Sequence, residues 1–90
     1  MYKLKLYVVD HSPVAKRARE NLKEALEKAC KGHYLLEVID LFNNLELGLR
    51  DKVFATPTVI KDSPKPVVRV IGDLKDPEKV LVKLGLPIQS

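Results

Sequence analysis

One strand-sized apolar run on each side of a single amphipathic stretch is the feature that most constrains the fold. Residues 3–9 alternate between polar and apolar and then become continuously apolar, and residues 34–40 form a second run. Both patterns are typical of strands with at least one face in a core. The stretch between them carries apolar residues at helical steps: Val14, Ala18, Leu22, Ala25, Leu26 and Ala29. This order predicts two parallel strands joined by a right-handed crossover helix.

The ends of the crossover helix also carry signals in the sequence. Residues 10–13 read as a turn, in which Ser12 is a good N-cap. Pro13 takes the first helical position, where its missing N–H costs nothing. Gly32 is predicted to end the helix, because glycine adopts the left-handed conformation that commonly follows a last helical turn.

A short helix is expected over residues 43–51, between the second strand and a third. Leu45 and Leu49 lie one helical turn apart, and we predict that both point inward. Asn43 or Asn44 supplies the cap, since asparagine is among the preferred N-cap residues. The segment therefore predicts a small helix that packs on the sheet through its leucines.

Two further strands and a last helix complete the pattern. Residues 56–61 and 67–71 are predicted to form strands, joined by a turn at residues 62–65. In the last helix Asp76 is the expected cap and Pro77 the first residue. Its apolar face is formed by Val80, Leu81 and Leu84, and Gly85 and Pro87 end it. The resulting βαβαββα order predicts a thioredoxin-like α/β fold. It has a mixed four-stranded sheet with helices on both faces and the second strand at an edge.

Length and composition fit one globular domain, expected to span residues 1–90. An apolar content of 46% with 31% charged residues is typical of such domains. No run approaches the ~20 apolar residues that span a bilayer, and the first residues enter a strand pattern without room for a signal peptide. The chain has a single cysteine, which cannot form an internal disulfide. These features favour a cytoplasmic protein without a membrane partner.

The formal net charge of +4 raises the question of a nucleic-acid partner. The long helix, however, mixes both signs along its length. Its pairs Glu24–Lys28 and Glu27–Lys31 stand four residues apart, where opposite charges support an exposed helix. An ordinary solvated face explains this pattern, so we expect no nucleic-acid partner.

The residues that a thioredoxin-like enzyme needs for catalysis are missing. Such redox enzymes place a thiolate at the start of the first helix, but residues 11–15 contain no sulfur. Cys30 lies near the opposite end, on the apolar stripe, and is expected in the core. His11 next to Ser12 lacks a third orienting group, and His33 lies at the other end of the helix. We expect no enzymatic activity, no cofactor and no metal site.

Pro57 opens the third predicted strand, at the position where thioredoxin-like folds place a cis-proline. Cis bonds are only ~5–6% of X–Pro bonds in folded proteins, but the fold context raises that frequency for Thr56–Pro57. A cis bond and a plain trans start of the strand are both left open at this point.

Several tracts, in the same order and spacing over nearly the whole chain, resemble the KaiB family of circadian-clock proteins. They are Leu4-Lys5-Leu6-Tyr7-Val8, Ser12-Pro13 with Arg17-Ala18, Val38-Ile39-Asp40, Ala55-Thr56-Pro57-Thr58 and Val70-Ile71-Gly72-Asp73-Leu74. The tract Glu78-Lys79-Val80-Leu81 is similar to the last helix of the family. The resemblance rests on the order and coverage of these tracts rather than on one motif.

The resemblance implies a non-enzymatic adaptor. KaiB proteins bind the ATPase KaiC and, on its ring, capture KaiA or compete with the kinase SasA, whose sensor domain is itself KaiB-like. We therefore expect a KaiC-type ATPase as partner, with KaiA- or SasA-like proteins as further partners, and a role in the phosphorylation and timing cycle. A sensory domain of a SasA-type histidine kinase is the alternative. A thioredoxin-like redox protein is disfavoured by the missing cysteine.

The family also implies two folds for one sequence, a tetrameric ground state and a thioredoxin-like, KaiC-binding state. In the ground state the last helix becomes a strand. The residues expected to influence this choice are Pro57, Gly72, Asp73, Lys83 and Gly85. Lysine at position 83, where the family has glycine, favours helix by roughly 0.5–1 kcal/mol, and Gly85 adds a helix stop. We expect mainly the thioredoxin-like state as a monomer, with a dimer or tetramer accompanying the other state.

Partner binding is expected in two groups of residues. The first lies on the first strand and the exposed start of the first helix: Tyr7, Ser12, Pro13 and Arg17. The second lies on the edge strand, where a partner strand would add to the sheet: Leu35, Glu37, Val38 and Asp40. For Tyr7 the alternative is a place at the edge of the core. For the edge strand the alternative is an edge kept unpaired by its acidic residues.

Overall fold

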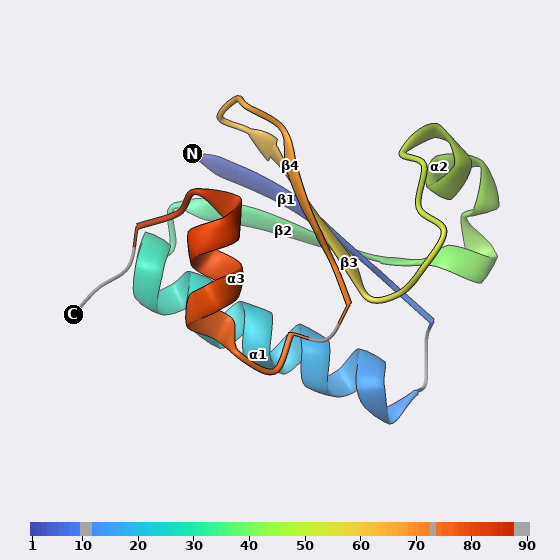
Figure 1. Ribbon diagram of the computed structural model, residues 1–90, viewed down its shortest axis with the longest axis horizontal. Helices are drawn as coiled ribbons and strands as arrows, with labels where there is room; N and C mark the ends of the chain where they lie inside the picture. Colours follow the sequence, from blue (N-terminus) through green and yellow to red (C-terminus); the bar gives the residue numbers. More distant parts are fainter. Residues whose placement is uncertain (10–11, 73, 88–90) are drawn as a thin grey trace.

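A mixed four-stranded sheet in the order β2-β1-β3-β4 organises the computed structural model, which describes residues 1–9, 12–72 and 74–87 (Figure 1). In chain order the elements are β1 (Tyr2–Val8), α1 (Pro13–Cys30), β2 (Tyr34–Asp40), the 3-10 helix η1 (Leu41–Asn43), α2 (Leu45–Arg50), β3 (Thr58–Ser63), β4 (Val68–Ile71) and α3 (Pro77–Leu84). β1 runs parallel to β2 and antiparallel to β3, which pairs antiparallel with β4. The predicted βαβαββα order and the edge position of β2 are confirmed.

The helices cover the two faces of the sheet unequally. α1 and α3 pack together on one face, while the segment around α2 covers part of the other face (Figure 1). The main core lies under α1 and α3 and takes alternate residues of β1, namely Leu4, Leu6 and Val8. A smaller second core lies on the α2 side: Tyr7, Ile39, Val53 and Ile60. The prediction of helices on both faces is confirmed.

The predicted cap of α1 is present. Ser12 Oγ accepts a hydrogen bond from the Ala15 N–H at 3.0 Å, and the hydroxyl donates to the Val9 carbonyl at 3.0 Å. At the other end Lys31 takes a left-handed conformation with φ 47°, and Gly32 follows with φ 83°. The helix thus ends just before these two residues, which together turn the chain toward β2.

α3 begins and ends as predicted. The Asp76 side chain caps its first turn, and Gly85 takes the left-handed conformation with φ 74° at its end. The N–H groups of Gly85 and Leu86 return to the carbonyls of Val82 at 3.0 Å and Leu81 at 2.9 Å. This glycine-based C-cap satisfies carbonyls that the last helical turn leaves without intrahelical partners.

The predicted inward face of α2 is wrong. Leu45 and Leu49 are 57% and 68% exposed. The buried residue of α2 is Gly48, which lets the helix approach Leu41 so closely that an added Cβ would collide with the leucine side chain. A helix of six residues is too short for the spacing of its apolar residues to decide which face packs.

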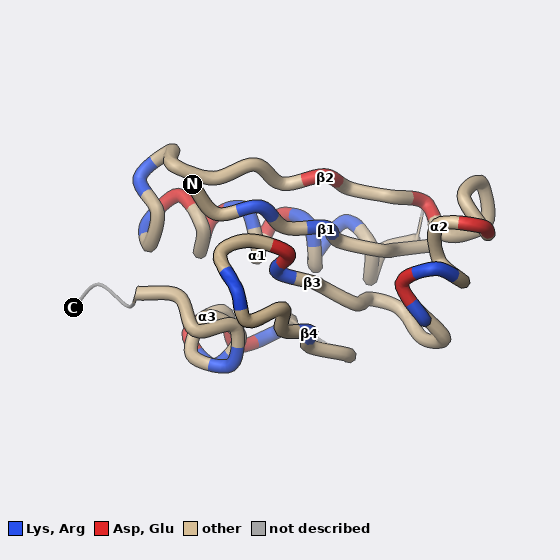
Figure 2. The backbone as a smooth tube through the Cα atoms, turned by 90° about the horizontal axis from the view of Figure 1, so that it is seen from above, with Lys and Arg blue, Asp and Glu red and all other residues tan. Residues whose placement is uncertain are grey.

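Basic and acidic residues alternate in short stretches along α1 (Figure 2), and all of them are exposed. Lys28 pairs with Glu24 at 3.3 Å, as their spacing predicts. Val14, predicted for the buried stripe, is instead 45% exposed, and Ala15 is buried because the stripe begins one position later. The predicted turn at residues 10–11 lies outside the described residues.

The boundaries of the last two strands also differ from the prediction. β3 begins at Thr58 rather than at residue 56, since Pro57 has no N–H to donate to a strand ladder. Residues 62–63, predicted in a turn, extend β3, and β4 begins at Val68 rather than at residue 67. The Thr56–Pro57 peptide bond, left open by the sequence, is cis.

In solution, residues 77–84 should give helical ¹³Cα chemical shifts. The substitution Lys83→Gly should lower the free energy of unfolding in urea by about 0.5–1 kcal/mol, because glycine loses more conformational freedom in a helix. Lys23→Gly on the exposed face of α1 is the matched control, with a similar cost and unchanged shifts for residues 77–84. Strand-type shifts for residues 77–84 in the unmodified chain would contradict this fold.

Candidate partner-binding surfaces

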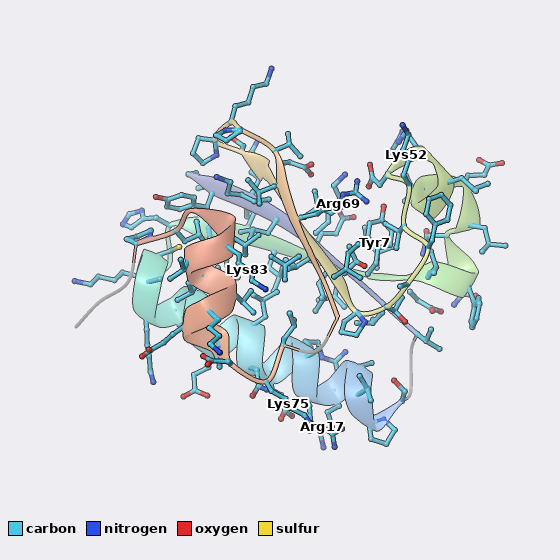
Figure 3. All side chains as sticks on the ribbon, viewed as in Figure 1. Tyr7, Arg17, Lys52, Arg69, Lys75 and Lys83 are labelled. Carbon is cyan, nitrogen blue, oxygen red and sulfur yellow. The ribbon has the colours of Figure 1, made fainter. Side chains whose placement is uncertain are left out.

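The first group of predicted partner-binding residues lies at the start of α1. Pro13 and Arg17 are exposed, and the Arg17 side chain points away from the sheet (Figure 3). Ser12 is half-buried, and its hydroxyl already makes two hydrogen bonds within the chain. Ser12 therefore supports the helix, and the accessible part of this group is Pro13 and Arg17.

The second predicted group lies along the edge strand β2. Leu35 and Val38 are 55% and 38% exposed, while Glu37 is exposed and Asp40 is half-buried. Apolar and acidic side chains thus alternate along an accessible strand edge. The expectation of an exposed edge is confirmed, and binding of a partner strand there stays a prediction.

The backbone of β2 also presents hydrogen-bonding groups at this edge. The Tyr2 N–H donates to the His33 carbonyl at 3.2 Å, which sets the phase of the parallel ladder between β1 and β2. Pairing alternates along such a ladder, so the N–H groups of Leu36 and Val38 point away from β1. No other strand of the described chain pairs with that side of β2.

The second predicted group is divided between the two faces of the sheet. The register pairs Leu35 with Lys3 and Glu37 with Lys5, on the sheet face opposite to the main core. Arg17 lies on α1, which covers the main core. Val38 and Asp40 pair with Leu6 and Val8 on the α1 side, so only a partner that contacts Arg17 together with Leu35 and Glu37 must wrap around the β2 edge.

Tyr7 is not the exposed contact that was predicted. Its side chain is fully buried in the second core, so the alternative of a core position is correct. The hydroxyl donates to Asp51 Oδ2 at 2.5 Å, and the Leu47 carbonyl lies 3.2 Å away. The physical reason is that β1 has a strand on each side and that the segment around α2 covers this end of its outer face.

A polar network ties the segment around α2 to the sheet. Lys5 Nζ pairs with Asp51 at 2.9 Å and with Asp62 at 3.1 Å. From β4, the Arg69 guanidinium donates to the carbonyls of residues 51 and 52, the second at 3.0 Å. Tyr7 and Arg69 lie on this side of the molecule in Figure 3. We call these side chains the Asp51 network: Lys5, Tyr7, Asp51, Asp62 and Arg69.

The pKa values in the Asp51 network follow from burial and pairing. Burial alone would raise the pKa of the Asp51 carboxyl, but hydrogen bonds from Tyr7 and Lys5 outweigh it, so the pKa is lowered. Burial alone would lower the pKa of the Lys5 ammonium, but hydrogen bonds to Asp51 and Asp62 raise it. Burial, reinforced by the hydrogen bond to Asp51, raises the pKa of Tyr7. At neutral pH the network therefore holds a charged pair and a neutral phenol.

Four large apolar side chains around α2 are exposed to solvent, and we call them the α2 apolar surface. They are Phe42 (66%), Leu45 (57%), Leu49 (68%) and Phe54 (81%). The side of this segment that faces the sheet carries Asp51 together with Leu47 and Val53 of the second core, and the four exposed side chains face outward. The sequence pattern did not reveal this surface, although both phenylalanines of the chain flank this one short helix. Exposed apolar groups gathered in one segment favour a contact with another molecule.

The described residues offer little for catalysis or metal binding. Cys30 is confirmed as a buried core residue, and burial raises the pKa of its thiol, which disfavours the reactive thiolate. No group of three or more metal-ligating side chains occurs in residues 1–9, 12–72 and 74–87. In the same part of the chain, no helix has both the length and the apolar character needed to span a membrane.

The residues predicted to influence a choice between two folds lie at the ends of different elements. Gly72 follows β4 with φ 108°, and its N–H donates to the Pro57 carbonyl at 2.9 Å. Lys83 is exposed on α3, and Gly85 caps that helix. Asp73 lies outside the described residues. The influence of these residues on the fold stays a prediction.

Comparison with known sequences gives a match to the KaiB domain over residues 5–86. The circadian clock oscillator protein KaiB of Trichodesmium erythraeum is 51% identical over 85 residues, which cover 94% of this chain and 82% of that protein. The KaiB protein of Prochlorococcus marinus subsp. pastoris is 52% identical, covering 94% of this chain and 79% of that protein. That of Thermosynechococcus vestitus is 51% identical with the same coverages of 94% and 79%.

Comparison with solved structures gives the fold. The N-terminal domain of Synechococcus elongatus SasA has a TM-score of 0.75 at 23% identity, covering 93% of this chain and 83% of that chain. The germline-specific thioredoxin Deadhead of Drosophila melanogaster has a TM-score of 0.72 at 18% identity, covering 93% of this chain and 78% of that chain. The predicted thioredoxin-like fold is confirmed, and likeness at these identities carries no further conclusion about activity.

Removing the Tyr7 hydroxyl should measure the strength of the Asp51 network. Tyr7→Phe should lower the free energy of unfolding by about 1.5–3 kcal/mol, because a hydrogen bond to a partly buried carboxylate is lost. Tyr34→Phe is the matched control, since its hydroxyl bonds to Glu27 at an exposed position and water replaces that bond. The control should cost no more than about 0.5 kcal/mol. Equal losses for the two variants in urea titrations would contradict the network.

The lowered pKa of Asp51 predicts a dependence of stability on pH. Its stabilising contribution is full above the ordinary value of 3.8 and is lost as the pH falls through the lower value of the folded chain. Asp51→Asn should therefore reduce the acid-induced loss of unfolding free energy between about pH 5 and pH 2. The control is Asp62→Asn, at a more exposed carboxylate, which should leave most of that loss in place. Superimposable pH profiles for Asp51→Asn and the unmodified chain would refute the assignment.

Proposed function

Because the chain belongs to the KaiB family of circadian clock proteins, we propose that it acts as a clock adaptor. In this proposal the chain docks, without catalysis of its own, on a KaiC-type ATPase ring and regulates its phosphorylation and timing cycle. The observation that carries the proposal is the family match, which reaches from β1 to α3. In this proposal residues 1–90 fold as one domain, and that domain binds the ring.

Two accessible regions support docking. At the start of α1, Arg17 offers an exposed cation and Pro13 a rigid apolar group next to it. At the β2 edge, the outward N–H groups of Leu36 and Val38 suit an added strand, where backbone bonds give affinity and side chains give specificity. Leu35 and Glu37 of the β2 edge lie on the sheet face opposite to α1, so one chain would have room for the ring and for a second protein on it.

The α2 apolar surface adds a third region that favours protein binding. Its exposed phenylalanine and leucine side chains would gain most from burial against an apolar surface of the ring. Tyr7 then contributes as a positioning residue, because it holds the segment that displays this surface and does not itself reach the partner. This replaces the direct contact expected for Tyr7 from the sequence.

The thioredoxin-like fold that the chain shares with the SasA N-terminal domain supports a relation to a further clock protein. Two domains of one shape can occupy one docking position on a ring, so a SasA-like kinase would compete with this chain. A KaiA-like protein captured at the β2 edge would be a separate, third partner.

We further propose that the chain works mainly in the thioredoxin-like state as a monomer. Lys83 is compatible with the interior of α3, and Gly85 gives that helix a left-handed cap. Both residues favour helix where the alternative family fold requires a strand. The state that binds the ring would then need no slow conversion before docking.

The test of the proposal is complex formation between the full chain and the KaiC-type ATPase of the same organism, loaded with nucleotide. Sedimentation analysis should detect the chain on the ring. Arg17→Glu should weaken binding at least about tenfold, because a charge reversal in a docking surface costs more than 1.4 kcal/mol.

Lys79→Glu, the same change at an exposed position of α3, is the matched control and should bind within about threefold of the unmodified chain. A chain that keeps its fold and does not sediment with the ring refutes the adaptor role. Equal weakening by both reversals would mean that only net charge matters, and would refute the docking surface at α1.

A further inference from the structure

A charged side chain lies in the core beneath the end of α3. Lys61 on β3 is 4% exposed, and it is the one charged residue among the buried residues of the described chain. The strand register places it between Leu4 of β1 and Val68 of β4. Leu4 belongs to the main core, so the aliphatic stem of Lys61 lies on the face that α1 and α3 cover.

The ammonium group of Lys61 reaches the C-terminal end of α3. A Cβ atom placed on Gly85 would lie 3.7 Å from Lys61 Nζ. Gly85 is the left-handed cap of α3, and the N–H groups of Gly85 and Leu86 donate to carbonyls of the last turn. Lysine commonly buries its stem and keeps its charged end at a polar boundary, and here that boundary is a helix terminus.

This position favours a positive charge for two reasons. The last carbonyls of a helix lack intrahelical partners. The cap satisfies the carbonyls of Leu81 and Val82, and the carbonyls of residues 83 and 84 come next in the chain. The peptide dipoles of the helix also add to a partial negative charge at this end, which attracts a cation. Among the described residues no carboxylate forms an ion pair with Lys61 and no acceptor takes a hydrogen bond from its ammonium group, so the nearby end of α3 acts on this charge through the helix dipole and not through a bond.

We propose that Lys61 is an internal cation cap of α3, whose charge holds the end of the last helix against the sheet. The helix is short, with eight residues, and it packs through Val80, Leu81 and Leu84. Leu84 and, just beyond the cap, Leu86 are buried, so apolar packing and the Lys61 charge together keep the C-terminal turn closed. Without the charge, that turn, and Leu86 with it, would open more often.

The substitution Lys61→Met tests the charge, because methionine keeps an unbranched stem and removes the ammonium group. Amide hydrogen exchange, measured by NMR on the full chain, should be about fivefold faster at Gly85 and Leu86 in this variant. The change is expressed relative to the Leu6 amide on β1, so that a change in overall stability cancels. Lys83→Met is the matched control on the exposed face of α3 and should leave these ratios within about twofold.

Exchange ratios at Gly85 and Leu86 that match those of Lys83→Met would overturn the proposal, since Lys61 would then act through its stem alone. If Lys61→Met does not fold, the proposal is tested by NMR on the unmodified chain. Its Lys61 ammonium should give a ¹H–¹⁵N signal with slower proton exchange than that of Lys83. Equal exchange at the two ammonium groups would overturn the proposal as well. Neither measurement uses a clock partner, so both are independent of the adaptor role.

Discussion

Leu6 and Tyr7 are adjacent on β1 and fully buried, one in each core, and the arrangement around α2 depends on this back-to-back burial. Leu6 joins an apolar core and needs no polar partner. Tyr7 brings a hydroxyl into the second core, where an unpaired hydroxyl is costly. Asp51 accepts its hydrogen bond. A carboxylate in that position needs a cation in turn, and Lys5 supplies it from the same strand at 2.9 Å.

These requirements decide which side of the α2 segment faces the sheet. Asp51 and the Leu47 carbonyl turn inward to meet Tyr7. The opposite side of a six-residue helix must then face solvent, and it carries Leu45 and Leu49. The α2 apolar surface is thus a consequence of the contacts on the other side of the segment, both the polar ones of Asp51 and the apolar ones of Leu47 and Val53. Its apolar area remains for a partner, whose binding would bury it without disturbing either core.

The sequence predicted the features that neighbouring residues decide. Ser12 and Asp76 were identified as caps because an N-cap bonds to a backbone group three residues away. The edge strand and the exposed start of α1 followed from the strand–helix–strand unit. The sequence failed where the partner is distant, since Tyr7 meets Asp51 across 44 positions and Lys61 reaches the end of α3 only in the folded chain. Nothing in the local pattern around a tyrosine or a lysine marks such a partner.

The thioredoxin-like fold alone does not decide between catalysis and recognition, because the Deadhead thioredoxin and the SasA domain share it with this chain. Redox catalysis in such a fold would need a thiolate at the start of α1, where the helix dipole lowers its pKa. Here Ser12 accepts from the Ala15 N–H and donates to the Val9 carbonyl, so its hydroxyl is committed to the backbone in both directions. A nucleophile needs a base to take its proton, and the Ser12 proton is instead hydrogen-bonded to the Val9 carbonyl, which is not a base. The start of α1 therefore offers the shape of Pro13 and the charge of Arg17, both exposed, as the proposed adaptor role requires.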